Sequence, residues 1–176
     1  MRREQLEITE MHEIARIFSD GLVCHLAFNC KGRAPYIVAM NYAYEGAART
    51  DASSSIAAPQ AITLWFHSAD SGRKLDLLKE DPLVAFQIET RVKLAKGSGL
   101  QACDWGMEYE SIVGEGLLAM VRDPREKQHG LLQIIKHYGA EGLAFGDVML
   151  AKTEVLRLSV QEYAAKRSSR LMPQIG

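Results

Sequence analysis

Apolar positions recur along the chain at two different spacings, and they divide it into short helices and strands. Residues Thr9 to Phe18 carry apolar side chains at helical spacing and predict an amphipathic helix with Thr9 as its N-cap. Residues 22–29 and 34–44 are strand-like and flank a Lys31-Gly32 turn, so they predict a hairpin. The expected apolar face of the helix comprises Ile14, Ile17 and Phe18.

The second half of the chain continues this mixture. A short helix is predicted over 74–79, ended by Asp81-Pro82, and the clearest helix begins at Asp123-Pro124 and ends at Tyr138-Gly139. The tail from Ala164 is basic, and we expect it to be loosely held. The remaining predicted strands are 61–68, 83–89, 107–121 with a bulge at Gly114 or Gly116, and 153–160.

These elements favour an antiparallel sheet. The predicted strands are joined by hairpins or short excursions, without the regular crossovers that a parallel sheet needs. We therefore expect a mainly β fold, a closed or partly closed antiparallel barrel of about six strands with short peripheral helices. The length of 176 residues suits a single domain spanning 1–176.

Composition narrows the class of protein. The formal net charge of -1 argues against a nucleic-acid partner. The chain has no apolar run long enough to span a membrane and no secretory signal at its N-terminus, so we expect a cytoplasmic protein. The three cysteines lack CxxC spacing, which disfavours a disulfide framework or a structural metal site. Nucleophile-elbow, zinc-protease and phosphate-loop motifs are absent from the sequence.

The segment from Leu64 to Asp76 carries the candidate chemistry. A strand ends at Ser68, Gly72 gives the following turn its freedom, and Arg73-Lys74 open a short helix. Free N–H groups at a helix start, a forked guanidinium and an ammonium together suit a phosphate. The same basic pair is also typical of a solvated helix end, where it opposes the helix dipole, and this alternative stays open.

With its flanking residues, this segment resembles the flavin-phosphate segment of FMN-binding split-barrel proteins, the pyridoxamine 5'-phosphate oxidase-like family. It is most similar to the nitroimidazole-resistance-type members, and the likeness extends over nearly the whole chain. One departure is a longer loop at 46–60. The matching stretches are Phe66-His67-Ser68-Ala69 with Gly72-Arg73-Lys74, Cys24 to Ala27, Pro35 to Val38 with Asn41-Tyr42, Ala102 to Trp105 with Tyr109 and Ser111, and Ala151 to Thr153.

The resemblance implies an FMN cofactor, with FAD as a second option. It implies that Arg73 and Lys74 hold the phosphate with help from Ser68, and that His67 lines the ribityl chain or the ring. It places Val38, Met40 and Asn41 on the strand that passes the isoalloxazine edge. Two alternatives stay open, because His67 could be a histidine of the barrel wall and Asn41 could stabilise a turn or strand end.

The resemblance also implies a homodimer with the flavin sites at its interface. In that arrangement Trp105, Tyr109 and Ser111 would meet the flavin of the partner chain. Tyr109 and Ser111 are two apart and share one side of a strand. Alternatively, Trp105 is a hydrophobic plug, Tyr109 and Ser111 simply pack at the interface, and Cys103 is structural or peripheral.

The function implied by the resemblance is a flavin-dependent oxidoreductase that reduces a small-molecule electron acceptor, with nitro compounds such as nitroimidazoles as one option. Pyridoxamine phosphate oxidation is disfavoured, because the arginine-rich C-terminal end of that enzyme is missing. The sequence identifies no catalytic residue and no metal site. Two rivals are a non-catalytic flavin carrier or sensor, and a haem- or deazaflavin-binding barrel. The candidate iron ligands are His25, His67, His129 and His137.

Overall fold

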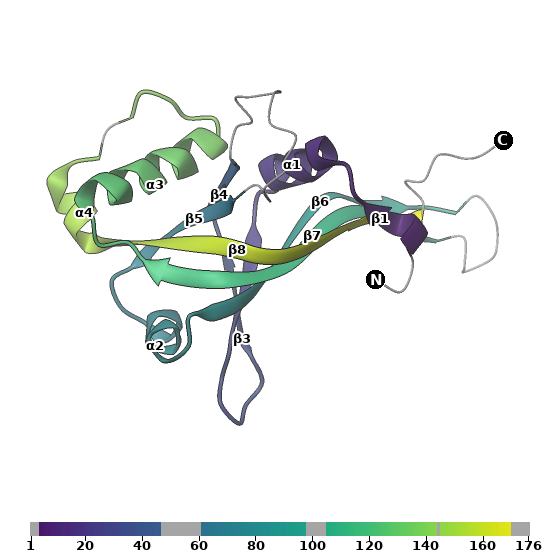
Figure 1. Ribbon diagram of the computed structural model, residues 1–176. Helices are drawn as coiled ribbons and strands as arrows, with labels where there is room; N and C mark the ends of the chain where they lie inside the picture. Colours follow the sequence, from purple (N-terminus) through teal and green to yellow (C-terminus); the bar gives the residue numbers. More distant parts are fainter. Residues whose placement is uncertain (1–3, 47–60, 98–104, 144, 170–176) are drawn as a thin grey trace, which may run out of the picture.

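The computed structural model describes residues 4–46, 61–97, 105–143 and 145–169 (Figure 1). No helix in these ranges is long and apolar enough to cross a membrane. The helical elements are η1 (Glu4–Leu6), α1 (Met11–Asp20), α2 (Arg73–Glu80), α3 (Pro124–His137) and α4 (Asp147–Lys152). The strands are β1 (Glu7–Ile8), β2 (Cys24–Phe28), β3 (Tyr36–Met40), β4 (Tyr42–Gly46), β5 (Ile62–Ala69), β6 (Leu83–Ala95), β7 (Gly106–Met120) and β8 (Thr153–Arg167).

The sheet is antiparallel throughout and curls until its two ends meet. Its strand order is β3-β2-β6-β7-β8-β5-β4, and β1 pairs with β8 off this path. The strands at the two ends, β3 and β4, are separated in sequence only by Asn41. Because one residue joins the two ends, the sheet must close into a barrel, although β3 and β4 do not pair with each other. The expected antiparallel split barrel is confirmed.

Two sequence-based expectations about the strands need correction here. The single strand predicted over 34–44 is divided at Asn41, because barrel closure sends β3 to pair with β2 and β4 to pair with β5. The sheet also holds more strands than the six expected, since this division and the short β1 add to the number. The predicted bulge is confirmed at Gly116, where the β7–β8 register shifts.

Helix α1 packs its apolar face against the barrel core. Its buried residues are Ile14, Ile17 and Phe18, as its apolar spacing predicted. The Phe18 ring stacks on Tyr44 at 4.9 Å between centroids, and the Tyr42 hydroxyl donates a 2.6 Å hydrogen bond to the Phe18 carbonyl. The predicted cap at Thr9 is wrong, because Glu10 occupies the N-cap position and makes no side-chain capping hydrogen bond.

Helix α3 covers the outer face of the sheet over β4, β5 and β8. Its start is as predicted, because Asp123 accepts a 2.8 Å hydrogen bond from the Glu126 amide. Gly130 lets the helix approach closely, since a β-carbon there would lie 2.6 Å from Cε3 of Trp65. The second core cluster beneath this helix comprises Ala43, Trp65, Val121, Leu131, Ile134 and Val155.

The expectation of a loosely held tail from Ala164 is wrong for residues 164–169, and residues 170–176 lie outside the described residues. Strand β8 continues to Arg167 and pairs with β7 and β1, so that Ala165 is buried between Ile8 and Ile112. Arg167 also donates a 2.6 Å hydrogen bond to Glu13. These partners lie far away in the sequence, and local composition does not reveal them.

Strand β6 is longer than the predicted 83–89, because it extends to Ala95 and pairs with the start of β7. Helix α4 was not predicted. The long loop noted at 46–60 falls almost entirely outside the described residues.

Candidate functional site

The corner between β5 and α2 carries the candidate phosphate site. Gly72 stands at the N-cap of α2 with φ 126° and ψ 164°, a conformation that favours glycine. The first helical hydrogen bonds run from the amides of Leu75 and Asp76 to the Gly72 carbonyl. The N–H groups of Arg73 and Lys74 precede these bonds, so they belong to the donors that a helix leaves free at its start.

The two cations of this corner carry no ion pair with any described residue. The Arg73 guanidinium lies over the Tyr36 ring, and its Nη2 is 3.9 Å from the Cys30 sulfur. Lys74 is half-buried. The corner therefore combines helix-start amides with two un-neutralised charges, which is a donor set that fits a phosphate.

Ser68 and His67 lie on the strand that leads into this corner. The Ser68 hydroxyl donates a 2.6 Å hydrogen bond to the Ala69 carbonyl. His67 is exposed on β5, next to the buried Phe66. The alternative of a histidine packed in the barrel wall is therefore not what the structure shows, and the imidazole is free to meet a ligand.

The residues predicted to meet the flavin ring lie where the barrel is split. Strands β3 and β4 are the edges of the sheet, so each has one side without a strand partner among the described residues. Asn41 joins them and is exposed, while Val38 is half-buried on β3. The Met40 side chain is buried in the core, so only its main chain can contact a ligand. Free main-chain groups at this split suit the polar edge of a ring.

The other predicted residues lie in a separate place. Trp105, which is 50% exposed, stands just before β7, and Tyr109 and Ser111 lie on the strand itself. Tyr109, Ser111 and Lys166 line a groove of about 740 Å³ on the outer face of the sheet. The Lys166 ammonium lies 5.7 Å from the centre of the Tyr109 ring. Sequence reasoning missed Lys166, because it assigned this part of the chain to a tail.

The structure does not bring these two groups together within one chain. Figure 1 shows α2 at the lower left, whereas the end of β6 and the start of β7 extend far to the right. Arg73, Lys74 and Ser68 therefore form one group, and Tyr109 and Ser111 form another. One ligand can touch both groups only if a second chain supplies one of them.

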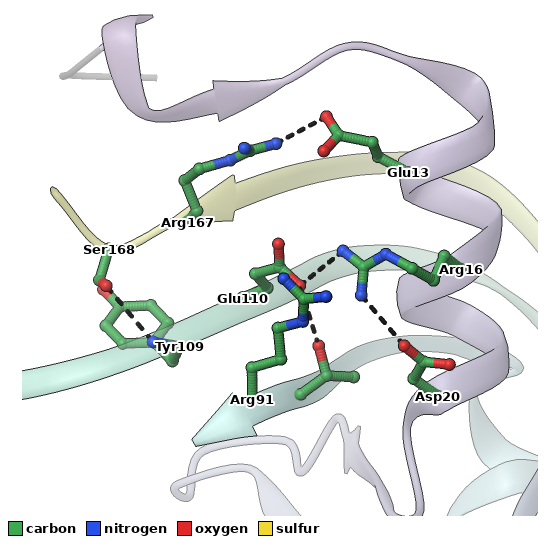
Figure 2. A network of polar contacts seen from close by, with 9 residues as sticks. Glu13, Arg16, Asp20, Arg91, Tyr109, Glu110, Arg167 and Ser168 are labelled. Atoms are coloured by element: carbon green, nitrogen blue, oxygen red, sulfur yellow. Dashed lines mark hydrogen bonds and ion pairs between the residues drawn. The ribbon is translucent and has the colours of Figure 1, made fainter. Parts of the chain in front are cut away.

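A buried ionic network lies directly behind Tyr109 and Ser111 (Figure 2). The Glu110 carboxylate is 2% exposed and lies 2.6 Å from Nη2 of Arg16 on α1. Nε of Arg91 lies 3.6 Å from the same carboxylate. Burial by itself lowers the pKa of Arg16, but the hydrogen bonds to Glu110 and Asp20 outweigh it and raise the pKa.

This network was not foreseen, because Arg16 and Glu110 are far apart in the sequence. Arg91 has a positive φ of 53°, and it stands where the β6–β7 register shifts between Thr90 and Lys93. The ion pair between the exposed Arg91 side chain and the buried Glu110 carboxylate joins this irregular part of β6 to the strand that carries Tyr109.

Most of the candidate iron ligands have protein partners. Nε2 of His129 lies 3.0 Å from Glu45, Nε2 of His137 lies 2.7 Å from the Gly21 carbonyl, and Nδ1 of His25 lies 3.6 Å from Glu89. Within the described ranges, no three His, Cys, Asp or Glu side chains cluster in a way that could hold a metal ion.

Comparison with solved structures supports the fold. A protein from Bacteroides thetaiotaomicron VPI-5482, provisionally named a 5-nitroimidazole antibiotic resistance protein, is 24% identical with a TM-score of 0.72, over 92% of this chain and 86% of that one. An FAD- and haem-binding protein from Mycobacterium smegmatis is 16% identical with a TM-score of 0.69, over 93% and 73%. An FAD-binding protein from Mesorhizobium loti is 18% identical with a TM-score of 0.57, over 92% and 96%.

Comparison with sequences gives one family. No curated protein matches the chain. A family model described as pyridoxamine 5'-phosphate oxidase matches residues 10–167, which is most of the chain and includes both groups of candidate site residues. The chain therefore belongs to the pyridoxamine 5'-phosphate oxidase family.

Proposed function

We propose that this protein binds FMN and acts as a flavin-dependent oxidoreductase on a small-molecule electron acceptor. The observation that carries the proposal is the β5–α2 corner, where Arg73 and Lys74 stand at a helix start without a carboxylate partner among the described residues. A single corner of this kind suits the one phosphate of FMN. Family membership and the flavin-binding proteins among its structural relatives support the same function.

The working site requires a homodimer in this proposal. Arg73, Lys74 and Ser68 of one chain would hold the phosphate, and Tyr109 and Ser111 of the other would approach the ring. The outer face of β2, β3, β6 and β7 supports this arrangement, because large apolar side chains are exposed there. A symmetric pair of chains would bury this face and complete two sites at once. The apolar residues of this face include Ile37, Leu83, Val113 and Leu117.

In this account the protein binds and orients, and the redox chemistry belongs to the bound flavin. Arg73 and Lys74 anchor the phosphate end. The free edges of β3 and β4 offer main-chain donors and acceptors to the ring, and Asn41 adds a side-chain amide. Burial of the apolar outer face against a second chain would exclude water from the ring. Nitro compounds are the acceptors that we propose first, because of the name of the Bacteroides relative.

Turnover is the experiment that tests this function. Purified protein loaded with FMN is mixed with NADH or NADPH and a nitroimidazole, and oxidation of the nicotinamide is followed by absorbance. Turnover that needs the protein, the FMN and the acceptor supports the proposal. Stoichiometric FMN binding without turnover of any nitro, quinone or flavin acceptor would replace it with a carrier or sensor. Haem in place of flavin would contradict it.

A further inference from the structure

Arg73 is held against an aromatic ring on a neighbouring strand. Its guanidinium carbon lies 4.7 Å from the centroid of the Tyr36 ring. Tyr36 is the first residue of β3, whereas Arg73 is the first residue of α2. The same guanidinium also reaches the Cys30 sulfur, at 3.9 Å, in the connection between β2 and β3. No carboxylate within the described residues is paired with it.

Stacking leaves this guanidinium free to bind an anion. The contact with Tyr36 places the guanidinium carbon over the face of the ring, where the ring quadrupole attracts the cation. The N–H groups lie in the plane and point outward from its edges. One arginine can therefore stack on an aromatic ring and donate a forked pair of hydrogen bonds to a phosphate at the same time.

The ring itself is well fixed. Tyr36 pairs with Phe28 across the β2–β3 hairpin, and the two rings lie 6.4 Å apart between centroids. Tyr36 is half-buried and packs against the barrel core. A fixed platform removes rotamer freedom from the long arginine side chain before a ligand arrives, and preorganisation of this kind strengthens binding.

We propose that Tyr36 is a positioning residue for Arg73, and that the Tyr36–Arg73 pair gives the site a preference for a flavin with a terminal monophosphate over an unphosphorylated flavin. This inference rests on the proposed function. Tyr36 takes no part in the chemistry of the flavin ring. It acts only by positioning the Arg73 guanidinium at the phosphate end.

The test compares FMN with riboflavin. Both ligands are titrated into apoprotein while the quenching of flavin fluorescence is followed, for the wild type, Tyr36→Leu and Tyr36→Phe. Tyr36→Leu removes the π face, so it should weaken FMN binding about two- to fivefold, the value expected of an exposed cation–π contact, and leave riboflavin binding unchanged. Tyr36→Phe keeps the ring and should retain the wild-type preference.

Two further variants show whether the effect passes through the guanidinium. In an Arg73→Met background, Tyr36→Leu should cause no additional loss of FMN binding, because the interaction is already gone. Cys30→Ala should leave the preference intact, since a thiol is only a weak acceptor.

Circular dichroism checks that each variant folds. Tyr36→Ile serves as a second non-aromatic variant, because a branched side chain suits a strand.

The outcomes separate the inference from the function beneath it. Wild-type protein that binds FMN no better than riboflavin would overturn both the role of Tyr36 and the proposed phosphate site. A wild-type preference for FMN that is undiminished in Tyr36→Leu and Tyr36→Ile, or is reduced equally in Tyr36→Phe, would overturn the role of Tyr36 and leave FMN binding standing. A reduction of the FMN preference by about two- to fivefold in Tyr36→Leu and Tyr36→Ile but not in Tyr36→Phe, with no further reduction in the Arg73→Met background, supports the inference.

Discussion

The carboxylate of Glu110 on β7 lies 2.6 Å from the guanidinium of Arg16 on α1, and this pair ties the helix to the sheet behind the candidate ring-facing residues. Glu110 is almost fully buried, so its charge has little contact with water. Loss of one partner would therefore cost more free energy than the intact pair contributes, because the remaining charge would be buried without compensation.

Removal of the arginine should destabilise the fold strongly. Arg16→Met leaves the Glu110 carboxylate with the longer contacts to Arg91 and to the Thr90 hydroxyl, and breaking such a pair costs about 3 kcal/mol. Urea unfolding followed by circular dichroism measures the change. The exposed pair of Lys79 with Asp76 is the control, because Lys79→Met should cost less than about 0.5 kcal/mol. Equal losses in the two variants would contradict the assignment.

The phosphate corner should be separable from the fold. Arg73→Ala with Lys74→Ala removes two exposed or half-exposed cations, and alanine suits a helix, so the unfolding midpoint should change little. Loss of two charge-assisted hydrogen bonds should weaken FMN about 100-fold or more. Equilibrium dialysis with FMN measures this loss. Lys79→Ala in the last turn of the same helix should bind normally, and full FMN retention in the double variant would refute the phosphate assignment.

The proposed dimer has its own test. Val113 lies on the outer face of β7 and is 43% exposed, so Val113→Glu places a charge in the proposed interface. Sedimentation equilibrium should show a dimer for the wild type and a dimer dissociation constant raised at least about tenfold in the variant. Leu132 on α3 is 40% exposed on another surface and provides the matched control, Leu132→Glu. A monomeric wild type would contradict the shared site.

Much of the local structure can be predicted from the sequence alone. The helical spacing of Ile14, Ile17 and Phe18 predicts the buried face of α1, and Asp123-Pro124 predicts the start of α3. The basic corner at Arg73 is predictable too, because a strand, a glycine turn and a helix start are all local patterns. The candidate phosphate-binding residues could therefore be predicted from the sequence.

Features that depend on contacts between residues far apart in the sequence could not be predicted in this way. The break at Asn41 depends on which strands pair after the barrel closes, and the residues on both sides of it are equally strand-like. The strand structure at Ala165 depends on the pairing of β8 with β1 and β7. The stacking of Arg73 on Tyr36 likewise joins residues that only the folded barrel brings together.

Alkaline pH should destabilise the protein through Cys24. Burial raises the pKa of this thiol well above its ordinary value of 9.0. Above pH 9 the unfolded chain loses this proton and the folded chain keeps it, so stability is present at lower pH and falls as pH rises. Between pH 8 and pH 10 the contribution of this thiol falls by about 1.4 kcal/mol.

Urea unfolding at the two pH values measures this dependence. Cys24→Ala should have a lower free energy of unfolding than the wild type at both pH values. Between pH 8 and pH 10, however, its free energy of unfolding should fall less than that of the wild type. Leu26→Ala, from the same buried strand, carries no titrating group and should keep the wild-type dependence. An unchanged dependence in Cys24→Ala would show that the thiol is not responsible.

The central claim is that the corner at Arg73 and Lys74 holds the phosphate of a flavin. The most direct test is the visible absorption spectrum of the freshly purified protein, followed by release and chromatography of the chromophore. We expect a two-banded yellow spectrum and release of FMN. A Soret band, or a colourless protein that also fails to bind added FMN, would contradict it.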